Sequence, residues 1–345
     1  MQITTEQERN PWLQRFHIDG PLLFALLILA ALSVTTVYSA SGENMAMLER
    51  QVIRIGVAFM AMLVIAQIPL SAVQRWSLPI FAAGLTLLLA VLLFGESSKG
   101  AQRWLNIGVA TIQPSELMKL AVPMTIAWFI AEQGIPPRKR RLFSAMILIL
   151  VPTLMIAKQP DLGTSLLIAS SGIFVLFLAG PSWRLIGVFI VGISSFIPIL
   201  WIFLMRDYQR QRVLTLLNPE SDPLGSGYQI IQSKIAIGSG GIEGKGWLEG
   251  TQSQLEFLPE RHTDFIFAVF AEEFGLVGVI ALLILYSFII FRGLQIAMRA
   301  QQIYQKLLAG SLILTFFVYV MVNIGMVSGL LPVVGVPLPL ISYGG

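Results

Sequence analysis

A carboxylate and an amine stand close together at the start of an apolar run. Glu116 and Lys119 lie within the first turn or so of the run at 114–131, and residues three apart share one face of a helix. Ionisable side chains at membrane depth are costly and are functional candidates by default. Pro114 marks a helix start, and a helix N-terminus attracts anions such as phosphate. The spacing therefore predicts an anion-binding site, although simple capping would favour the same residue types.

The same pattern recurs before the apolar run at 162–180, where Pro160 precedes Asp161. A cavity that held Glu116, Lys119 and Asp161 would suit a diphosphate. A hard divalent cation, Mg²⁺ or Mn²⁺, could bridge that diphosphate to Glu116 or Asp161, because such cations prefer oxygen ligands. The residues require no other cofactor.

Asp264 stands directly before another long apolar run, at 265–291. Partial desolvation at the membrane surface would make its carboxylate a usable general base, and helix capping is the structural alternative. His262 fits an orienting or hydrogen-bonding role better than metal binding, because the sequence holds only two histidines and no cysteine.

Three further side chains are candidates for contacts with a phosphate or a sugar. Arg103 could reach a phosphate while Trp104 packs against a sugar or a lipid, or both could simply anchor a helix at the membrane interface. Arg210 lies among three arginines within residues 206–212. It could make bidentate phosphate contacts, or it could belong to a solvated helix end, where exposed ion pairs contribute little.

The composition places these residues in a membrane protein. Hydrophobic residues make up 55% of the 345-residue chain and charged residues 12%, whereas soluble domains carry about 45–50% and about 25%. So few charges cannot coat a water-facing surface, which excludes an ordinary soluble enzyme, a disordered protein and a nucleic-acid binder with a basic groove. The absence of cysteine excludes disulfides and thiolate metal sites.

Apolar runs long enough to cross a bilayer predict an all-α polytopic fold with nine visible transmembrane helices. The predicted spans are 18–39, 52–68, 77–94, 114–131, 143–157, 162–180, 184–205, 265–291 and 307–330. We expect residues 1–345 to form a single integral membrane domain.

The distribution of Lys and Arg predicts the orientation of these spans. With the N-terminus in the cytoplasm, the inner segments hold 11 basic and 4 acidic residues, and the outer segments hold 12 basic and 15 acidic residues. The basic run at 138–141 is the strongest single signal. The candidate residues then lie on the outer side of the membrane.

Residues 206–264 form one long extracytoplasmic loop, which holds 14 of the 42 charged residues. Its aromatic and isoleucine residues predict a folded segment, with a short helix around 227–237. A glycine-rich stretch at 238–246 lacks the residue spacing of a phosphate-binding P-loop and predicts only a loop.

Together these motifs closely resemble the shape, elongation, division and sporulation (SEDS) family over essentially the whole chain. The segments that carry the resemblance are GAQRWL (100–105), QPSE (113–116), QPDLGT (159–164), DYQRQR (207–212), KIAIGSGG (234–241), PERHTDFIF (259–267), AEEFG (271–275) and SYGG (342–345). The stretch 218–223 resembles the elongation branch of Gram-negative bacteria rather than the division branch.

The resemblance implies a peptidoglycan glycosyltransferase of ten helices that polymerises lipid II at the outer face of the inner membrane. It implies that Asp264 is the family's essential loop aspartate, that Glu116 and Lys119 are its cavity acid-and-base pair, and that Asp161 is a further cavity acid. The implied partners are a class B penicillin-binding protein and other membrane proteins of the elongation complex, and nucleic acid is not among them. The family's tenth helix would follow the SYGG segment, where this sequence ends.

Two other functions fit the same residues. In a lipid II flippase, the intramembrane charges would line a passage, but such a passage needs polar groups on both faces and the candidates cluster on the outer one. In a non-catalytic scaffold for the penicillin-binding protein, the cluster of titratable residues would have no purpose.

Overall fold

The computed structural model describes residues 16–98, 101–106, 111–199, 201–202, 205, 207–222, 225–254 and 258–345. Four basic residues used in the charge count, Arg9, Arg15, Lys99 and Arg206, lie outside these described residues.

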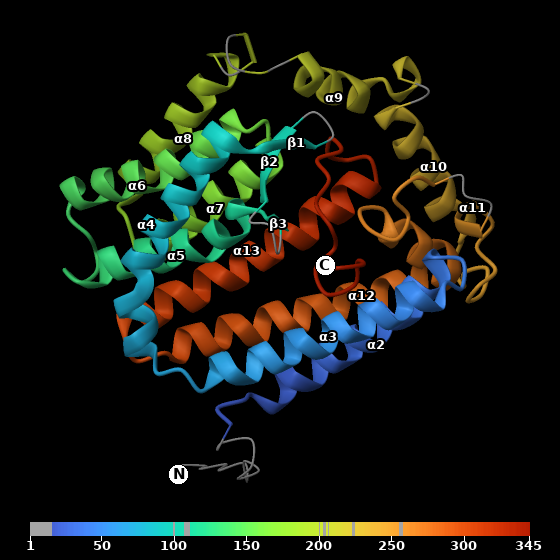
Figure 1. Cartoon of the computed structure of the whole chain (residues 1–345), viewed down its shortest axis with the longest axis horizontal. Helices are drawn as coiled ribbons and strands as arrows, with labels where there is room; N and C mark the ends of the chain where they lie inside the picture. Colours follow the sequence, from blue (N-terminus) through green and yellow to red (C-terminus); the bar gives the residue numbers. More distant parts are fainter. Residues whose placement is uncertain are drawn as a thin grey trace. The chain divides into compact units, whose positions relative to one another are not determined.

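Within the described residues, each of the nine predicted spans coincides with a helix (Figure 1). The helices are α2 (Gly20–Ala40), α3 (Met45–Ala66), α4 (Leu70–Phe94), α5 (Pro114–Ala131), α6 (Lys139–Lys158), α7 (Leu162–Leu178), α8 (Trp183–Ile199), α12 (Ile266–Arg299) and α13 (Ile303–Val327). Their ends differ from the predicted ones by up to eight residues. The reason is that a helix begins at its cap, as α3 does at Asn44, whereas hydropathy detects only the apolar part that follows.

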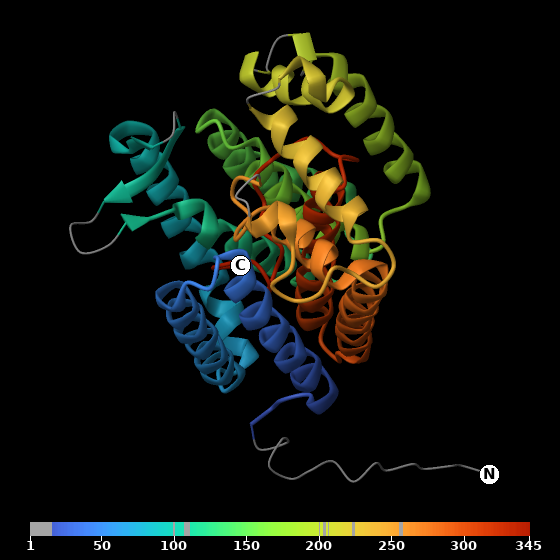
Figure 2. The same ribbon diagram turned by 90° about the vertical axis from the view of Figure 1, so that its right-hand side faces the viewer.

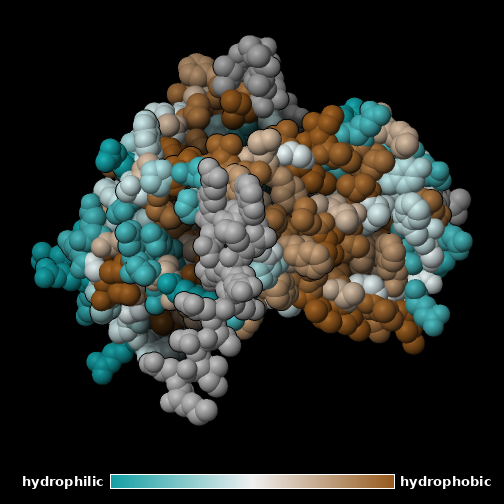
Figure 3. Space-filling view, turned by 90° about the horizontal axis from the view of Figure 1, so that it is seen from below, coloured by the Kyte–Doolittle hydropathy of each residue, from teal (hydrophilic) through white to brown (hydrophobic). Residues whose placement is uncertain are grey.

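Five of the described helices, α2, α4, α6, α12 and α13, are long and apolar enough to cross a membrane, and α7 is a shorter apolar helix. Many of their large apolar side chains are exposed, including Phe24, Leu93, Phe143 and Phe291. Figure 3 shows apolar side chains gathered on the surface of one face. Because lipid tails cover such side chains as well as protein does, the chain is a multi-pass helical membrane protein.

The chain folds as two compact units. Unit 1 consists of Met1–Ala72, Ile235–Arg292 and Pro337–Gly345, and it therefore contains α2, α3 and most of α12. Unit 2 consists of Val73–Lys234 and Gly293–Val336, and it contains α5 to α8 and α13 together with most of α4.

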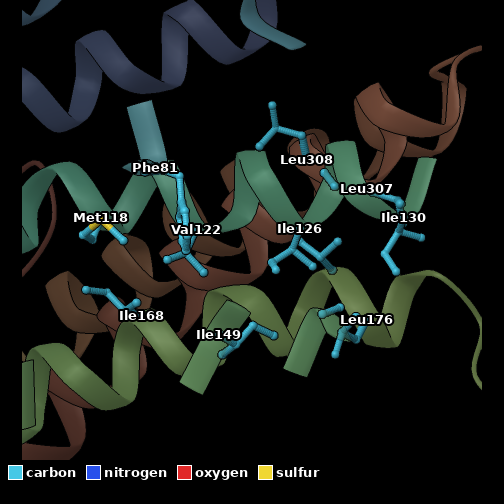
Figure 4. Packing of buried hydrophobic residues seen from close by; sticks show 14 of the residues in the cluster. Phe81, Met118, Val122, Ile126, Ile130, Ile149, Ile168, Leu176, Leu307 and Leu308 are labelled. Atoms are coloured by element: carbon cyan, nitrogen blue, oxygen red, sulfur yellow. The ribbon is translucent and has the colours of Figure 1, made fainter. Parts of the chain in front are cut away.

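The core of unit 2 forms where α4, α5, α6, α7 and α13 meet (Figure 4). Met118, Val122, Ile126 and Ile130 from one face of α5 are fully buried in it. Small residues allow the helices to approach closely, as is common in membrane bundles. A Cβ atom at Gly172 of α7 would meet side-chain atoms of Ile149 and Val122. This packing holds α5 and α7 in place against each other. The first turns of both helices carry candidate residues.

A small antiparallel sheet precedes α5, and the sequence did not predict it. Its strands are β1 (Glu96–Ser98), β2 (Ala101–Asn106) and β3 (Thr111–Ile112), in the order β1-β2-β3 (Figure 2). Trp104 pairs with Glu96, and Leu105 pairs with Ile112. β1 and β3 are too short to show an alternating hydrophobic pattern, and the six residues of β2, AQRWLN, do not alternate between apolar and polar.

The long segment at 206–264 is folded wherever the structure describes it. It contains α9 (Asp207–Leu217), the 3₁₀ helix η2 (Pro219–Ser221), α10 (Ser226–Ser239) and α11 (Thr251–Gln254). The predicted helix around 227–237 is confirmed as α10.

Candidate functional site

The first turn of α5 holds an ion pair. The Nζ atom of Lys119 lies 2.7 Å from Oε1 and 2.8 Å from Oε2 of Glu116. The Glu116 side chain is 57% exposed and that of Lys119 is 26% exposed, so the pair stands at an accessible surface. Pro114 and Ser115 beside it are buried. The predicted pairing of these two residues on one helix face is therefore confirmed.

Tyr319 of α13 lies against this pair. The Nζ atom of Lys119 is 5.2 Å from the centre of the Tyr319 ring, within range of a cation–π interaction. The Tyr319 hydroxyl is buried and makes no hydrogen bond of normal geometry in the described part of the chain. Tyr319 also lies within electrostatic range of Glu116 and Asp161, so the predicted cavity acids share a neighbour.

Asp161 caps the start of α7. Its Oδ1 atom accepts a hydrogen bond of 3.2 Å from the backbone N–H of Thr164, which satisfies one unpaired N–H group of the first turn. Its Oδ2 atom lies 3.6 Å from Nη1 of Arg103. Arg103 also donates from Nη2 to the Pro160 carbonyl over 2.6 Å. Arg103 of β2 and Asp161 of α7 thus form one charged pair, which the sequence proposed only as separate phosphate contacts.

Within unit 2 the structure therefore places two ion pairs at the starts of two packed helices, α5 and α7. Lys119 and Arg103 supply the positive charges, and the helix N-termini add partial positive charge. An anion entering here could replace either carboxylate as the partner of its cation, which is the chemistry that a diphosphate needs.

Trp104 and Arg210 have other surroundings. Trp104 follows Arg103 on β2, and it is 39% exposed. Arg210 of α9 donates from Nε to the Trp201 carbonyl and from Nη2 to the Ile202 carbonyl, each over 2.9 Å. Its Nη1 atom lies 3.5 Å from Oδ1 of Asp207. These contacts show a helix-end role for Arg210, and its role as a phosphate ligand stays a prediction.

The donor atoms at this site do not fit a resident metal ion. Within the described residues, no three His, Cys, Asp or Glu side chains lie close enough together to hold one. Glu116 and Asp161 each have a cationic partner, whose charge disfavours a second cation. A divalent cation that bridges a bound diphosphate to Glu116 or Asp161 would need fewer protein ligands, and it stays a prediction.

In unit 1, the segment that carries Asp264 is held by the end of the chain. The Ser342 hydroxyl donates to the Thr263 carbonyl over 2.6 Å, and the Tyr343 N–H donates to the His262 carbonyl over 2.9 Å. The His262 and Tyr343 rings meet edge to face with centroids 6.0 Å apart. Asp264 itself is half-buried. The two backbone contacts and the ring contact fix the residues immediately before Asp264.

The end segment is in turn fixed by α2 and α3. Gln51 of α3 donates to the Ser342 carbonyl and accepts from the Gly344 N–H, over 3.3 and 3.0 Å. Ser33 of α2 donates to the Ile341 carbonyl over 2.9 Å. The Arg54 guanidinium lies 4.2 Å from the centre of the Tyr343 ring.

The sequence did not predict the contacts that Ser342, Tyr343 and Gln51 make around the Asp264 segment. It also did not predict that Tyr319 lies beside Lys119. The SYGG segment was visible as a motif, but nothing in its spacing from Asp264 indicated a contact across almost 80 positions of the chain. Gln51 follows Glu49 and Arg50, directly before the predicted apolar run at 52–68, so it looked like part of a polar helix end. Tyr319 gave no signal, because a single tyrosine in an apolar helix is common.

Comparison with known proteins identifies relatives over the whole chain. The family model that covers FtsW, RodA and SpoVE, described as a cell cycle protein, matches residues 14–345. The chain is 57% identical to the peptidoglycan glycosyltransferase MrdB of Escherichia coli, over 99% of this chain and 93% of that protein. It is 35% identical to the stage V sporulation protein E of Bacillus subtilis, over 95% of this chain and 92% of that protein.

Two solved structures share the fold. One comes from work on the structural coordination of polymerization and crosslinking by a peptidoglycan synthase complex, with a TM-score of 0.80, 34% identity, and 94% of this chain and 92% of that chain covered. The other is the rod shape determining protein RodA of Thermus thermophilus, with a TM-score of 0.69, 27% identity, and 94% and 90% covered.

Proposed function

Because the chain belongs to the FtsW, RodA and SpoVE family of cell cycle proteins, we propose that it is a peptidoglycan glycosyltransferase. It joins lipid II disaccharides into glycan strands during cell elongation and the maintenance of rod shape. The observation that carries this function is the 57% identity to MrdB across nearly the full length of both proteins. The cations at the starts of α5 and α7 support it, because the reaction releases a lipid diphosphate.

Asp264 acts as the general base of the reaction. Its carboxylate takes the proton of the sugar 4-hydroxyl on the acceptor lipid II. The acceptor oxygen attacks the anomeric carbon of the lipid-linked growing glycan, and the bond from that carbon to the diphosphate breaks. The bonding electrons leave with the lipid diphosphate. A single direct displacement inverts the anomeric carbon, since no enzyme nucleophile takes part.

Lys119 and Arg103 stabilise the leaving diphosphate, with help from the N-termini of α5 and α7. Glu116 and Asp161 hold these cations in place until the substrate binds. Arg210 adds a further phosphate contact if it releases its present carbonyl partners. Trp104 packs against the sugar or the lipid, and His262 orients the loop through its contact with Tyr343.

The enzyme works in the bacterial inner membrane with its N-terminus in the cytoplasm and its active site in the periplasm. The basic run at 138–141, at the start of α6, supports this orientation. Its partner is a class B penicillin-binding protein, which crosslinks the new glycan. The fold shared with a chain from a synthase complex that couples polymerization and crosslinking supports this partnership.

Substitution of the proposed base tests the mechanism. We expect Asp264→Asn, purified with its partner, to polymerise lipid II about 10²- to 10⁴-fold more slowly than the unsubstituted chain, the usual contribution of a general base. Asp264→Glu, which keeps a carboxylate, should retain part of the activity. A folded Asp264→Asn complex that polymerised at the unsubstituted rate would remove Asp264 from the mechanism.

A second assay separates enzyme from transporter and scaffold. Purified protein should convert detergent-solubilised lipid II into glycan strands. Scrambling of lipid II in proteoliposomes without polymer would instead identify a flippase. Normal growth of cells in which Glu116, Lys119, Asp161 and Asp264 are all neutralised would identify a scaffold.

A further inference from the structure

The glycine-rich stretch at 238–246, which the function above does not use, lies against a break in α12. Gly275 has φ 61° and ψ −164°, so α12 consists of two half-helices, 266–274 and 276–299. In an unbroken helix, the N–H groups of Leu276 and Val277 would donate to the carbonyls of Glu272 and Glu273. The break leaves all four groups without these partners.

The glycine-rich stretch replaces these four hydrogen bonds. The N–H groups of Leu276 and Val277 donate to the carbonyls of Gly241 and Ile242, over 3.0 and 3.1 Å. The carbonyls of Glu272 and Glu273 accept from the N–H groups of Lys245 and Gly246, both over 3.0 Å. Backbone groups at membrane depth must be paired inside the protein. We call residues 241–246 the splint, because their backbone groups bridge the two half-helices.

Only glycine permits so close an approach. At Gly244, which has φ 85°, a Cβ atom would collide with the carbonyl of Glu273, and at Gly275 it would collide with the N–H of Gly244. Both positions also have the positive φ that disfavours other residues.

The buried carboxylate of Glu272 holds the splint in position. The Glu272 side chain is fully buried. Its Oε1 atom lies 2.7 Å from Nζ of Lys245, and it accepts hydrogen bonds from the Gln252 N–H over 2.9 Å and the Thr251 hydroxyl over 3.2 Å. A buried carboxylate requires such partners, so Glu272 holds both ends of the segment 245–252. The Ser39 hydroxyl of α2 donates to the neighbouring Glu273.

Asp264 lies between two segments that are held by contacts with other parts of the chain. The residues before it are tied to Ser342 and Tyr343. The half-helix after it, 266–274, ends at Glu272 and Glu273, about 12 Å further along. Because Gly275 separates this half-helix from the rest of α12, its direction is not set by a continuous helix, and the splint joins the packing of its buried side chains in holding it.

We propose that Lys245 and Glu272 are positioning residues for Asp264, acting through the splint that sets the direction of the first half of α12. This inference rests on the proposed function, in which Asp264 is the general base. Glu272→Gln should lower kcat about 10- to 100-fold, because small displacements of a reacting group have effects of that size. KM for lipid II should stay within about twofold, because neither residue binds substrate.

The experiment compares matched variants in the full chain with its partner, and it measures kcat, KM and thermal stability. Lys245→Arg keeps the charge and should retain most of kcat. Thr251→Val removes the hydroxyl that donates to Glu272 over 3.2 Å and accepts from Lys245 over 2.6 Å, but it leaves the Lys245–Glu272 ion pair, and it should give a smaller loss of kcat. Arg292→Gln is the control, because Arg292 forms an ion pair of the same length, 2.7 Å to Asp19, on the second half-helix. It should leave kcat unchanged.

Two results would overturn the inference: an unchanged kcat in folded Glu272→Gln and Thr251→Val, or equal losses of kcat in Glu272→Gln and Arg292→Gln that follow thermal stability. The unsubstituted chain and Asp264→Asn are measured beside them. An inactive unsubstituted complex would reject the proposed function, and an active Asp264→Asn would reject Asp264 as base. If these two behave as expected, a failure of the Glu272 series concerns the positioning role alone.

Discussion

Lys119 is held in a defined position before any substrate arrives. Its ammonium lies 2.7 Å from Glu116 and 5.2 Å from the centre of the Tyr319 ring. An unpaired ammonium at the edge of an apolar helix would be costly, so these neighbours keep it charged and oriented. A diphosphate that replaces Glu116 as the partner meets a cation already in place, which is the basis of electrostatic preorganisation.

At the scale of single residues, we predict that Lys119→Met lowers kcat/KM for lipid II polymerisation about 10²-fold or more. This is the usual loss when one preorganised charge-stabilising group is removed. Lys119→Arg should recover part of the loss, because it restores a cation without the same geometry. Lys306→Met, at an exposed position on α13, is the control and should match the unsubstituted chain. Equal activity of Lys119→Met and Lys306→Met would exclude Lys119 from catalysis.

At the scale of elements, the site depends on how closely α5, α6 and α7 pack. Gly172 of α7 faces Ile149 of α6 and Val122 of α5, so all three helices meet at a residue without a side chain. Lipid tails are as apolar as the helix surfaces, and close packing is therefore a main source of association energy between membrane helices.

We predict that Gly172→Ala lowers the free energy of unfolding by about 1–3 kcal/mol, because the added methyl group overpacks this contact. Gly56→Ala makes the same chemical change in α3, where nothing lies within 4 Å of the new Cβ atom. It should leave the melting temperature in detergent unchanged or raise it, since alanine favours helix. A melting temperature for Gly172→Ala at or above that of Gly56→Ala would contradict the packing argument.

At the scale of the whole molecule, the asymmetric distribution of charge predicts the orientation of the chain in the membrane. The basic run at 138–141 lies at the start of α6, and the segment at 206–264, after α8, carries 8 of the 19 acidic residues. Positively charged loops remain on the cytoplasmic side during insertion, so these two segments should lie on opposite sides of the membrane.

The natural absence of cysteine makes this orientation directly measurable. We predict that Glu220→Cys, at an exposed position in η2, reacts with a membrane-impermeant maleimide in cells whose inner membrane is intact. Ser182→Cys, exposed just before α8, should react only after the inner membrane is opened. The reverse pattern of labelling would invert the proposed topology.

The sequence by itself determined the class of the fold and the local chemistry. Apolar runs located the nine helices α2 to α8, α12 and α13, because hydropathy is summed over many residues, and the i, i+3 spacing on one helix fixed the Glu116–Lys119 pair. The ends of helices were less well predicted, because single capping residues decide them.

Only the tertiary structure decided which distant residues meet. The pairing of Arg103 with Asp161, the contact of Ser342 and Tyr343 with the Asp264 segment, and the splint formed by residues 241–246 all join separate stretches of the chain. The break at Gly275 was equally hidden, because a single glycine inside a long apolar run does not by itself mark a break. Such contacts depend on how whole helices pack, and one-dimensional spacing carries no record of that packing.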